Sequence, residues 1–94
     1  MDPTWLLLKR LAESVSAFSE ECAKQAADAC SLPMCEVSCG VYGLACVVID
    51  YNILLDDELW ADVQAYLDSD DYYKPEALEL RQQQKKLRNK DGAA

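Results

Sequence analysis

Histidine is absent from this chain of 94 residues. Its absence removes the side chain whose unperturbed pKa lies closest to neutral pH, and with it the commonest general base. The sequence also has no G-x-S-x-G nucleophile motif and no glycine-rich phosphate loop. We therefore expect a protein that is not an enzyme.

Long hydrophobic runs are missing as well. The longest uncharged stretch, Val37 to Ile49, has 13 residues, whereas a helix needs about 20 apolar residues to cross a bilayer. The opening residues, MDPTWLLLKRLAE, lack the basic start and the long apolar centre of a secretory signal. We expect no membrane association and a cytoplasmic, reducing location, in which the cysteines are free thiols.

Basic residues are few, because 9 lysines and arginines stand against 17 acidic side chains, for a net charge of −8. Residues 41–75 carry −7 of this charge, and residues 76–94 carry +2. Such a balance repels phosphate backbones and anionic lipid heads, which argues against direct binding of nucleic acid. It favours a partner with a basic surface.

Apolar residues make up 51% of the chain, which is enough for a small core. From Leu8 to Ala26 they recur at gaps of three and four, and this period predicts one helix over residues 3–30. Asp2 is a suitable N-cap for that helix, and Pro3 is a suitable first residue.

Residues 33–53 fit either a strand or a helix. Their β-branched residues favour a strand, and Gly40 and Gly43 each weaken a helix by about 1 kcal/mol. No other segment, however, offers a partner strand. An antiparallel helical hairpin about Pro33 places small residues opposite one another, such as Cys22 opposite Gly43, so that the axes can approach closely. We therefore predict a helix here.

Two further helices complete the predicted all-α fold. A third amphipathic helix is expected over 56–68, with Asp56 as its N-cap, and a loosely packed, basic C-terminal helix over 75–90. The latter has few apolar side chains and would either pack loosely through Leu78, Leu80 and Leu87 or become ordered on a partner. Residues 1–70 are expected to form the helical core domain, and residues 71–94 a linker, the basic helix and a frayed tail.

Five cysteines, at positions 22, 30, 35, 39 and 46, raise the question of a metal site. The spacing of Cys35 and Cys39 suits a zinc-binding pair, but neither a second distant pair nor a histidine completes a tetrahedral site. We expect the thiols to pack as small hydrophobic groups, with no metal and no cofactor. A thiol-based metal or redox protein using Cys30, Cys35 and Cys39 remains an alternative, with Cys30 and Cys35 best placed to oxidise.

The stretch DSDDYYKPEALE shares part of the pattern of a calcium loop. Asp68, Asp70 and Glu79 occupy the ligand positions 1, 3 and 12. Tyr72 and Tyr73, however, stand where the loop requires a ligand and a turn-forming glycine. These two mismatches argue against calcium binding.

Acidic and aromatic side chains together give the remaining candidate site. Carboxylates along one flank can offer charge to a basic groove, and tyrosines anchor interfaces with little loss of entropy. We therefore expect a non-enzymatic protein–protein interaction module, acting as an adaptor, an inhibitor or an assembly subunit. The predicted partner-binding residues are Trp5, Asp56, Asp57, Glu58, Asp62, Tyr66, Asp68, Asp70, Asp71, Tyr72 and Tyr73.

Two further hypotheses stay open at this point. The acidic flank could mimic nucleic acid and inhibit a DNA- or RNA-handling protein, because the carboxylates resemble a row of phosphates in charge. Alternatively, the chain could form a homodimer, which would cover apolar surface and close a four-helix arrangement by two-fold symmetry.

Overall fold

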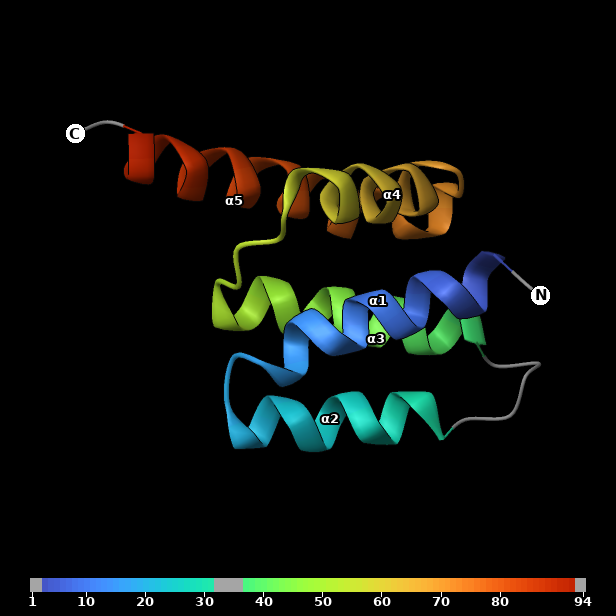
Figure 1. The fold of residues 1–94 in the computed structure, drawn as a ribbon. Helices are drawn as coiled ribbons and strands as arrows, with labels where there is room; N and C mark the ends of the chain where they lie inside the picture. The colour runs from blue at the N-terminus through green and yellow to red at the C-terminus, as the bar shows by residue number, and fades with distance from the viewer. Residues whose placement is uncertain (1–2, 32–36, 93–94) are drawn as a thin grey trace.

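The computed structural model describes residues 3–31 and 37–92, which are helical apart from short connections (Figure 1). The elements are α1 (Pro3–Ser16), α2 (Glu20–Cys30), α3 (Val37–Tyr51), α4 (Asp57–Asp68), the short 3-10 helix η2 (Asp71–Tyr73) and α5 (Lys74–Gly92). No strand occurs in these two ranges, so the predicted all-α class is confirmed. The N-cap predicted at Asp2, the break at Pro33 and the thiol of Cys35 lie outside the described residues.

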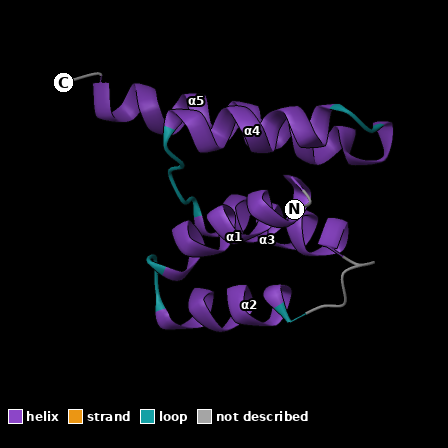
Figure 2. Ribbon diagram, turned by 45° about the vertical axis from the view of Figure 1, so that its right-hand side comes forward, coloured by secondary structure: helices purple, strands orange, loops and turns teal. Residues whose placement is uncertain are grey.

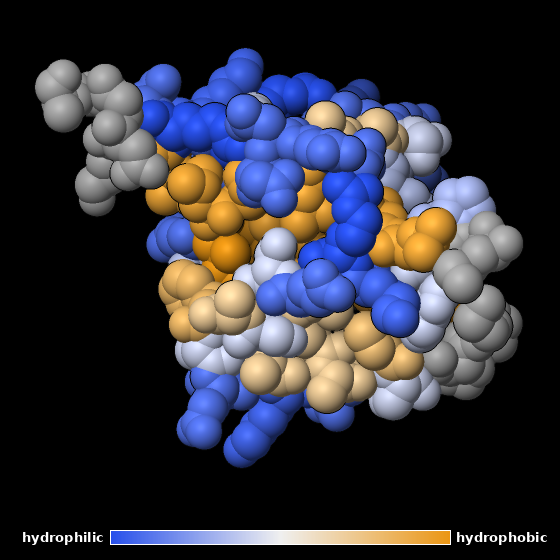
Figure 3. Space-filling view, viewed as in Figure 1, coloured by the Kyte–Doolittle hydropathy of each residue, from blue (hydrophilic) through white to orange (hydrophobic). Residues whose placement is uncertain are grey.

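The helices form two layers (Figures 1 and 2), and apolar side chains gather between them on the face drawn in Figure 3. One layer contains α1, α2 and α3, in which α2 runs antiparallel to α1 and α3 runs antiparallel to α2. The other layer is the antiparallel pair of α4 and α5, joined through η2. Within the described ranges no helix has both the length and the hydropathy that spanning a membrane requires.

The single helix predicted over 3–30 is wrong, because the chain turns at residues 17–19 and continues as a second helix. Ser19 makes this break possible. Its backbone is extended (φ −164°, ψ 167°), and its hydroxyl oxygen accepts a hydrogen bond from the Cys22 N–H at 3.1 Å. Two glutamates follow it in the first turn of α2, where negative charge is favourable. The start of α2 is therefore capped in the ordinary way.

The predicted apolar stripe nevertheless forms much of the core. These five stripe residues are at most 1% exposed: Leu8, Leu11, Val15, Cys22 and Ala26. Phe18 has the same spacing but lies in the turn, where its side chain is 49% exposed. The apolar period continues across the break, and so it could not reveal the turn.

Helices α2 and α3 lie against each other in a register about one turn further along α3 than predicted. The ring of Phe18 meets that of Tyr51 edge-on, with centroids 6.1 Å apart. At the other end, a Cβ atom on Gly40 would lie 3.2 Å from the carbonyl oxygen of Ala29. Gly40 is therefore the position of close approach, whereas a Cβ on Gly43 would have no neighbour within 4 Å.

The connection between the layers is defined by two caps. Asn52 adopts a left-handed backbone (φ 55°), and the Ile53 N–H bonds to the Val48 carbonyl at 3.0 Å, which ends α3. Asp56 then accepts a hydrogen bond from the Leu59 N–H at 2.8 Å as the N-cap of α4. The predicted third helix is confirmed, including its capping residue.

Helix α5 packs more closely than its low apolar content predicts. Leu80 and Gln84 are fully buried, and Ala77 is 4% exposed. Leu78, which was expected to contribute to the packing, instead faces solvent and is 52% exposed. The buried Gln84 side chain thus provides part of the packing that was expected from leucines.

Candidate protein-binding site

Four of the five tyrosines gather where α3, α4, η2 and α5 meet. We call Tyr42, Tyr66, Tyr72 and Tyr73 the tyrosine cluster. Tyr73 lies at its centre, stacked on Tyr42 at 5.2 Å and on Tyr66 at 6.1 Å between ring centroids. Tyr72 meets Tyr73 edge-on at 5.4 Å. The cluster is therefore held together by ring packing from three separate elements.

Exposure differs sharply within the tyrosine cluster. Tyr72 is 77% exposed, whereas Tyr42, Tyr66 and Tyr73 are partly buried. Asp70 fixes the backbone beneath Tyr72, because its carboxylate caps η2 and accepts the Tyr72 N–H at 2.9 Å. The outermost ring thus stands on a constrained backbone and is available for contact.

Glu76 at the start of α5 connects the tyrosine cluster to the second layer. The Tyr42 hydroxyl donates a hydrogen bond to Glu76 Oε1 at 2.9 Å. This hydrogen bond raises the pKa of Tyr42, and nearby Cys46 adds to the effect. The other carboxylate oxygen of Glu76 is buried and is the one buried side-chain oxygen or nitrogen in the described residues that lacks a hydrogen-bond partner.

Three predicted carboxylates lie next to the tyrosine cluster. Asp70, the N-cap of η2, and Asp71, its first residue, are both exposed. Asp68 forms an ion pair with Arg81 at 2.7 Å and accepts a hydrogen bond from the Gln64 amide at 3.1 Å. We call the tyrosine cluster with Asp68, Asp70 and Asp71 the acidic tyrosine surface.

The other predicted acids lie elsewhere on α4. Asp56, Asp57 and Glu58 are at its first turn, roughly 17 Å from its last residue at 1.5 Å per residue. Asp57 pairs with Arg88 at 2.8 Å. Asp62 faces α1 and pairs with Arg10 at 2.6 Å. The structure therefore divides the predicted acidic flank into separate groups, and arginines of the chain itself partly neutralise them.

The two tryptophans occupy different surroundings. Trp5 is partly buried against the core, with the Lys9 ammonium 6.0 Å from the centre of its ring. Trp60 also packs on the core, and the Arg88 guanidinium lies over its ring at 4.4 Å. Neither lies in the acidic tyrosine surface as defined by the contacts above.

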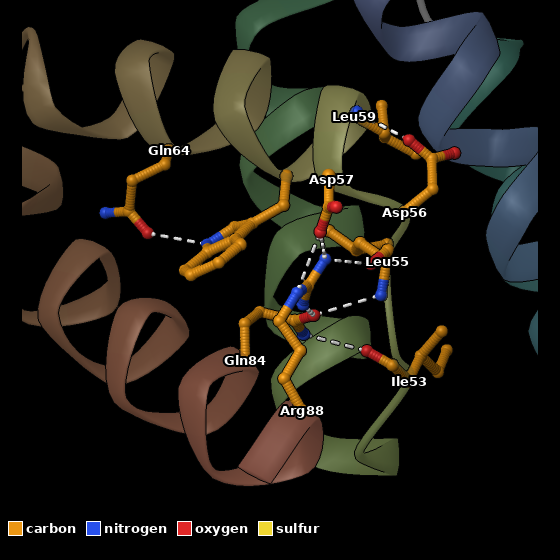
Figure 4. A network of polar contacts seen from close by, with 9 residues as sticks. Ile53, Leu55, Asp56, Asp57, Leu59, Gln64, Gln84 and Arg88 are labelled. Atoms are coloured by element: carbon orange, nitrogen blue, oxygen red, sulfur yellow. Dashed lines mark hydrogen bonds and ion pairs between the residues drawn. The ribbon is translucent and has the colours of Figure 1, made fainter. Parts of the chain in front are cut away.

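A buried polar network that the sequence pattern did not reveal joins α5 to the connection between α3 and α4 (Figure 4). Gln84 accepts a hydrogen bond from the Leu55 N–H at 3.0 Å and donates one to the Ile53 carbonyl at 2.8 Å. Arg88 donates to the Leu55 carbonyl at 2.6 Å and to Gln84 at 3.1 Å.

A second buried glutamine holds the pair of α4 and α5 together. Gln64 donates to the Ala77 carbonyl at 2.9 Å and accepts from the Trp60 indole N–H at 3.1 Å. One signal for these polar residues was present in the sequence, since Leu80, Gln84 and Leu87 share a helical face. The run RQQQKK, however, reads as a solvated surface.

The described cysteines differ in accessibility. Cys22 is buried, Cys30 and Cys46 are partly buried, and Cys39 is exposed, all as free thiols. Burial raises the pKa of the Cys46 thiol. Among the residues with described positions, no three cysteine or carboxylate side chains are placed to share a metal ion.

Comparison with known proteins adds no relative. No family model, no curated protein and no solved structure matches the chain.

Proposed function

We propose that this protein is a non-enzymatic interaction module whose acidic tyrosine surface binds a basic segment of another protein. The observation that supports this most directly is the exposed Tyr72 ring, which stands on a capped turn between Asp70 and packed tyrosines. Aromatic anchors with a charged rim are typical of interfaces that depend on a few side chains.

The tyrosine cluster suits binding because most of its ordering cost is met before a partner arrives. Tyr73 is fixed by two stacked neighbours, and Tyr72 rests against it. A tyrosine has few rotatable bonds, so burying it in an interface loses little side-chain entropy. A guanidinium group can also stack on such a ring.

The carboxylates beside the cluster supply the preference for a basic partner. Asp70 and Asp71 are exposed, and neither forms an ion pair among the described residues. Asp68 is partly neutralised by Arg81, so it contributes less to the local field. Exposed acids of this kind mainly steer association and set its dependence on salt.

The test measures binding of a fluorescein-labelled hexa-arginine peptide by fluorescence anisotropy. Tyr72→Ala is expected to raise the dissociation constant by about tenfold, as loss of an aromatic anchor does. The control, Leu54→Ala, removes another exposed apolar side chain outside the proposed surface. It should leave the dissociation constant within about twofold of the wild type.

Electrostatics are tested by a matched pair of double variants. Asp70→Asn with Asp71→Asn should weaken binding and flatten its salt dependence, whereas Glu13→Gln with Asp28→Asn makes the same change of charge away from the surface. Salt is varied between about 50 and 300 mM, where the screening length falls from about 14 to about 6 Å. Equal effects of the two double variants would show that the peptide senses only the net charge, and would refute the proposal.

A further inference from the structure

The outer face of α5 carries an exposed stripe centred on Leu78. Leu78 and Lys85 are seven residues apart within α5, so they lie on one face of the helix. Asp71, in η2 just before α5, lines the same hollow as Leu78 and extends this stripe. All three are exposed, and Leu78 is 52% exposed. The opposite face is the one that packs inward, since Leu80 and Gln84 are fully buried.

A hollow of about 340 Å³ lies beside Leu78. Its lining includes Lys74, Ala77, Leu78 and Arg81, which occupy positions i, i+3, i+4 and i+7 of the helix. Four residues in this arrangement form the hole that receives a side chain from a facing helix in knobs-into-holes packing. The carboxylates of the acidic tyrosine surface complete the lining.

Opposite charges are placed symmetrically about Leu78. Asp71 lies seven residues before it, and Lys85 lies seven residues after it. Asp70 and Lys86 repeat the pattern at a distance of eight residues. This arrangement is self-complementary, because two identical helices that run antiparallel and cross at Leu78 bring each acid opposite a lysine.

We propose that two copies of the chain pair through antiparallel α5 helices, with the Leu78 side chain of each copy inserted in the hollow of the other. In this register Asp71 faces Lys85 of the second copy, and Asp70 faces Lys86. The inference rests on the proposed function, because it names a second copy as a partner of the acidic tyrosine surface.

The residues of α5 on either side of Leu78 are compatible with this register. Lys74 lies opposite Gln82 of the second copy, and Pro75 lies opposite Arg81, so no two like charges are placed face to face. The contact is isologous and therefore closes at two copies, without growth of longer assemblies. Exposed ion pairs contribute little by themselves. Most of the affinity therefore comes from the Leu78 side chains, which become buried in the contact, and the charges set the register.

Sedimentation velocity of the full chain, from about 10 μM to about 1 mM, tests the pairing. The wild type should shift from monomer to dimer across this range. Asp71→Lys alone and Lys85→Glu alone should each remain monomeric, because each places like charges at both ends of the contact. An equimolar mixture of these two variants should dimerise, because both contacts then join opposite charges.

Controls separate this surface from others. Leu78→Asp should abolish the dimer, whereas Leu54→Asp, on an exposed leucine of the connection between α3 and α4, should not. Neither Asp71 nor Lys85 has a side-chain hydrogen bond or ion pair among the described residues, so both charge variants are expected to fold, and circular dichroism verifies this.

Three results would be decisive against the pairing or the proposed function. A wild type that stays monomeric throughout, or a dimer that survives Leu78→Asp, overturns the α5 contact. If a wild type that stays monomeric still binds the hexa-arginine peptide through Tyr72, the proposed function holds without the pairing. If the charge-swapped mixture dimerises but the peptide does not bind, the pairing stands and the more general basic-partner function falls.

Discussion

Replacing Gln84 by leucine should test whether the buried polar network holds the two layers together. The Gln84 side chain is fully buried, and its amide bonds both the Leu55 N–H and the Ile53 carbonyl (Figure 4). Leucine has nearly the same size but neither a donor nor an acceptor. Gln84→Leu therefore leaves two buried backbone groups without their partners.

The expected cost follows from those two groups. Each buried backbone group that loses its partner costs about 1–3 kcal/mol, and the added apolar burial offsets part of this. We expect a loss of about 2–4 kcal/mol from a total of roughly 5–14 kcal/mol for a domain of this length. For a domain of this size the loss corresponds to a fall in Tm of about 8–30 °C.

Urea unfolding followed by circular dichroism measures this loss directly. Gln82→Leu is the matched control, because Gln82 lies two residues earlier on the exposed face of α5. In dilute solution the control should stay within about 0.5 kcal/mol of the wild type. If Gln84→Leu is as stable as Gln82→Leu, the network does not stabilise the fold and the reasoning is wrong.

Two further predictions concern the packing of α3 and the alkaline limit of stability. Gly43→Ala should stabilise the protein by about 0.5–1 kcal/mol, because it removes a glycine from a helix interior at a position with open space. Gly40→Ala should destabilise it, since the new Cβ would lie 3.1 Å from a buried Leu8 methyl group. Equal shifts in Tm for the two variants would contradict the register of α2 and α3. In the folded protein the hydrogen bond to the Glu76 carboxylate raises the pKa of Tyr42 above the ordinary 10.0. Burial is the main cause that raises the pKa values of Tyr51 and Tyr73 above 10.0. The unfolded chain therefore loses these protons first, so the stabilisation is complete below pH 10 and declines as the pH rises further. Urea unfolding at a series of alkaline pH values should show a shallower decline in Tyr42→Phe, and an unchanged slope would refute this assignment.

The helices were largely predictable because their ends carry local chemistry. Asp56 caps α4 as its position before an acidic, periodic segment indicated, and Pro3 opens α1. The turn at residues 17–19 was missed because Phe18 preserves the spacing of the stripe while facing largely outward. Ser19 followed by two glutamates is an N-cap signal, but the apolar period that continues across it conceals the break.

The candidate site was predictable only in part because it depends on contacts between distant segments. Tyr66, Tyr72 and Tyr73 are close in sequence and were identified together. Tyr42 joins them through a stacked contact across 31 residues, and no local pattern indicates it. In the same way, Arg10 pairs with Asp62 across 52 residues, and this pairing partly neutralises one of the predicted binding acids.

The same contacts determine which charged side chains form ion pairs within the chain. All three arginines of the chain pair with aspartates of α4, one from α1 and two from α5. A guanidinium offers a planar set of donors that can hold a carboxylate and a carbonyl together, as Arg88 does with Asp57 and Leu55. No lysine whose side chain the structure describes makes such an ion pair. The arginines therefore link α4 to α1 and to α5. The proposed contacts instead use Asp70 and Asp71, which form no ion pair among the described residues, and the lysines of α5.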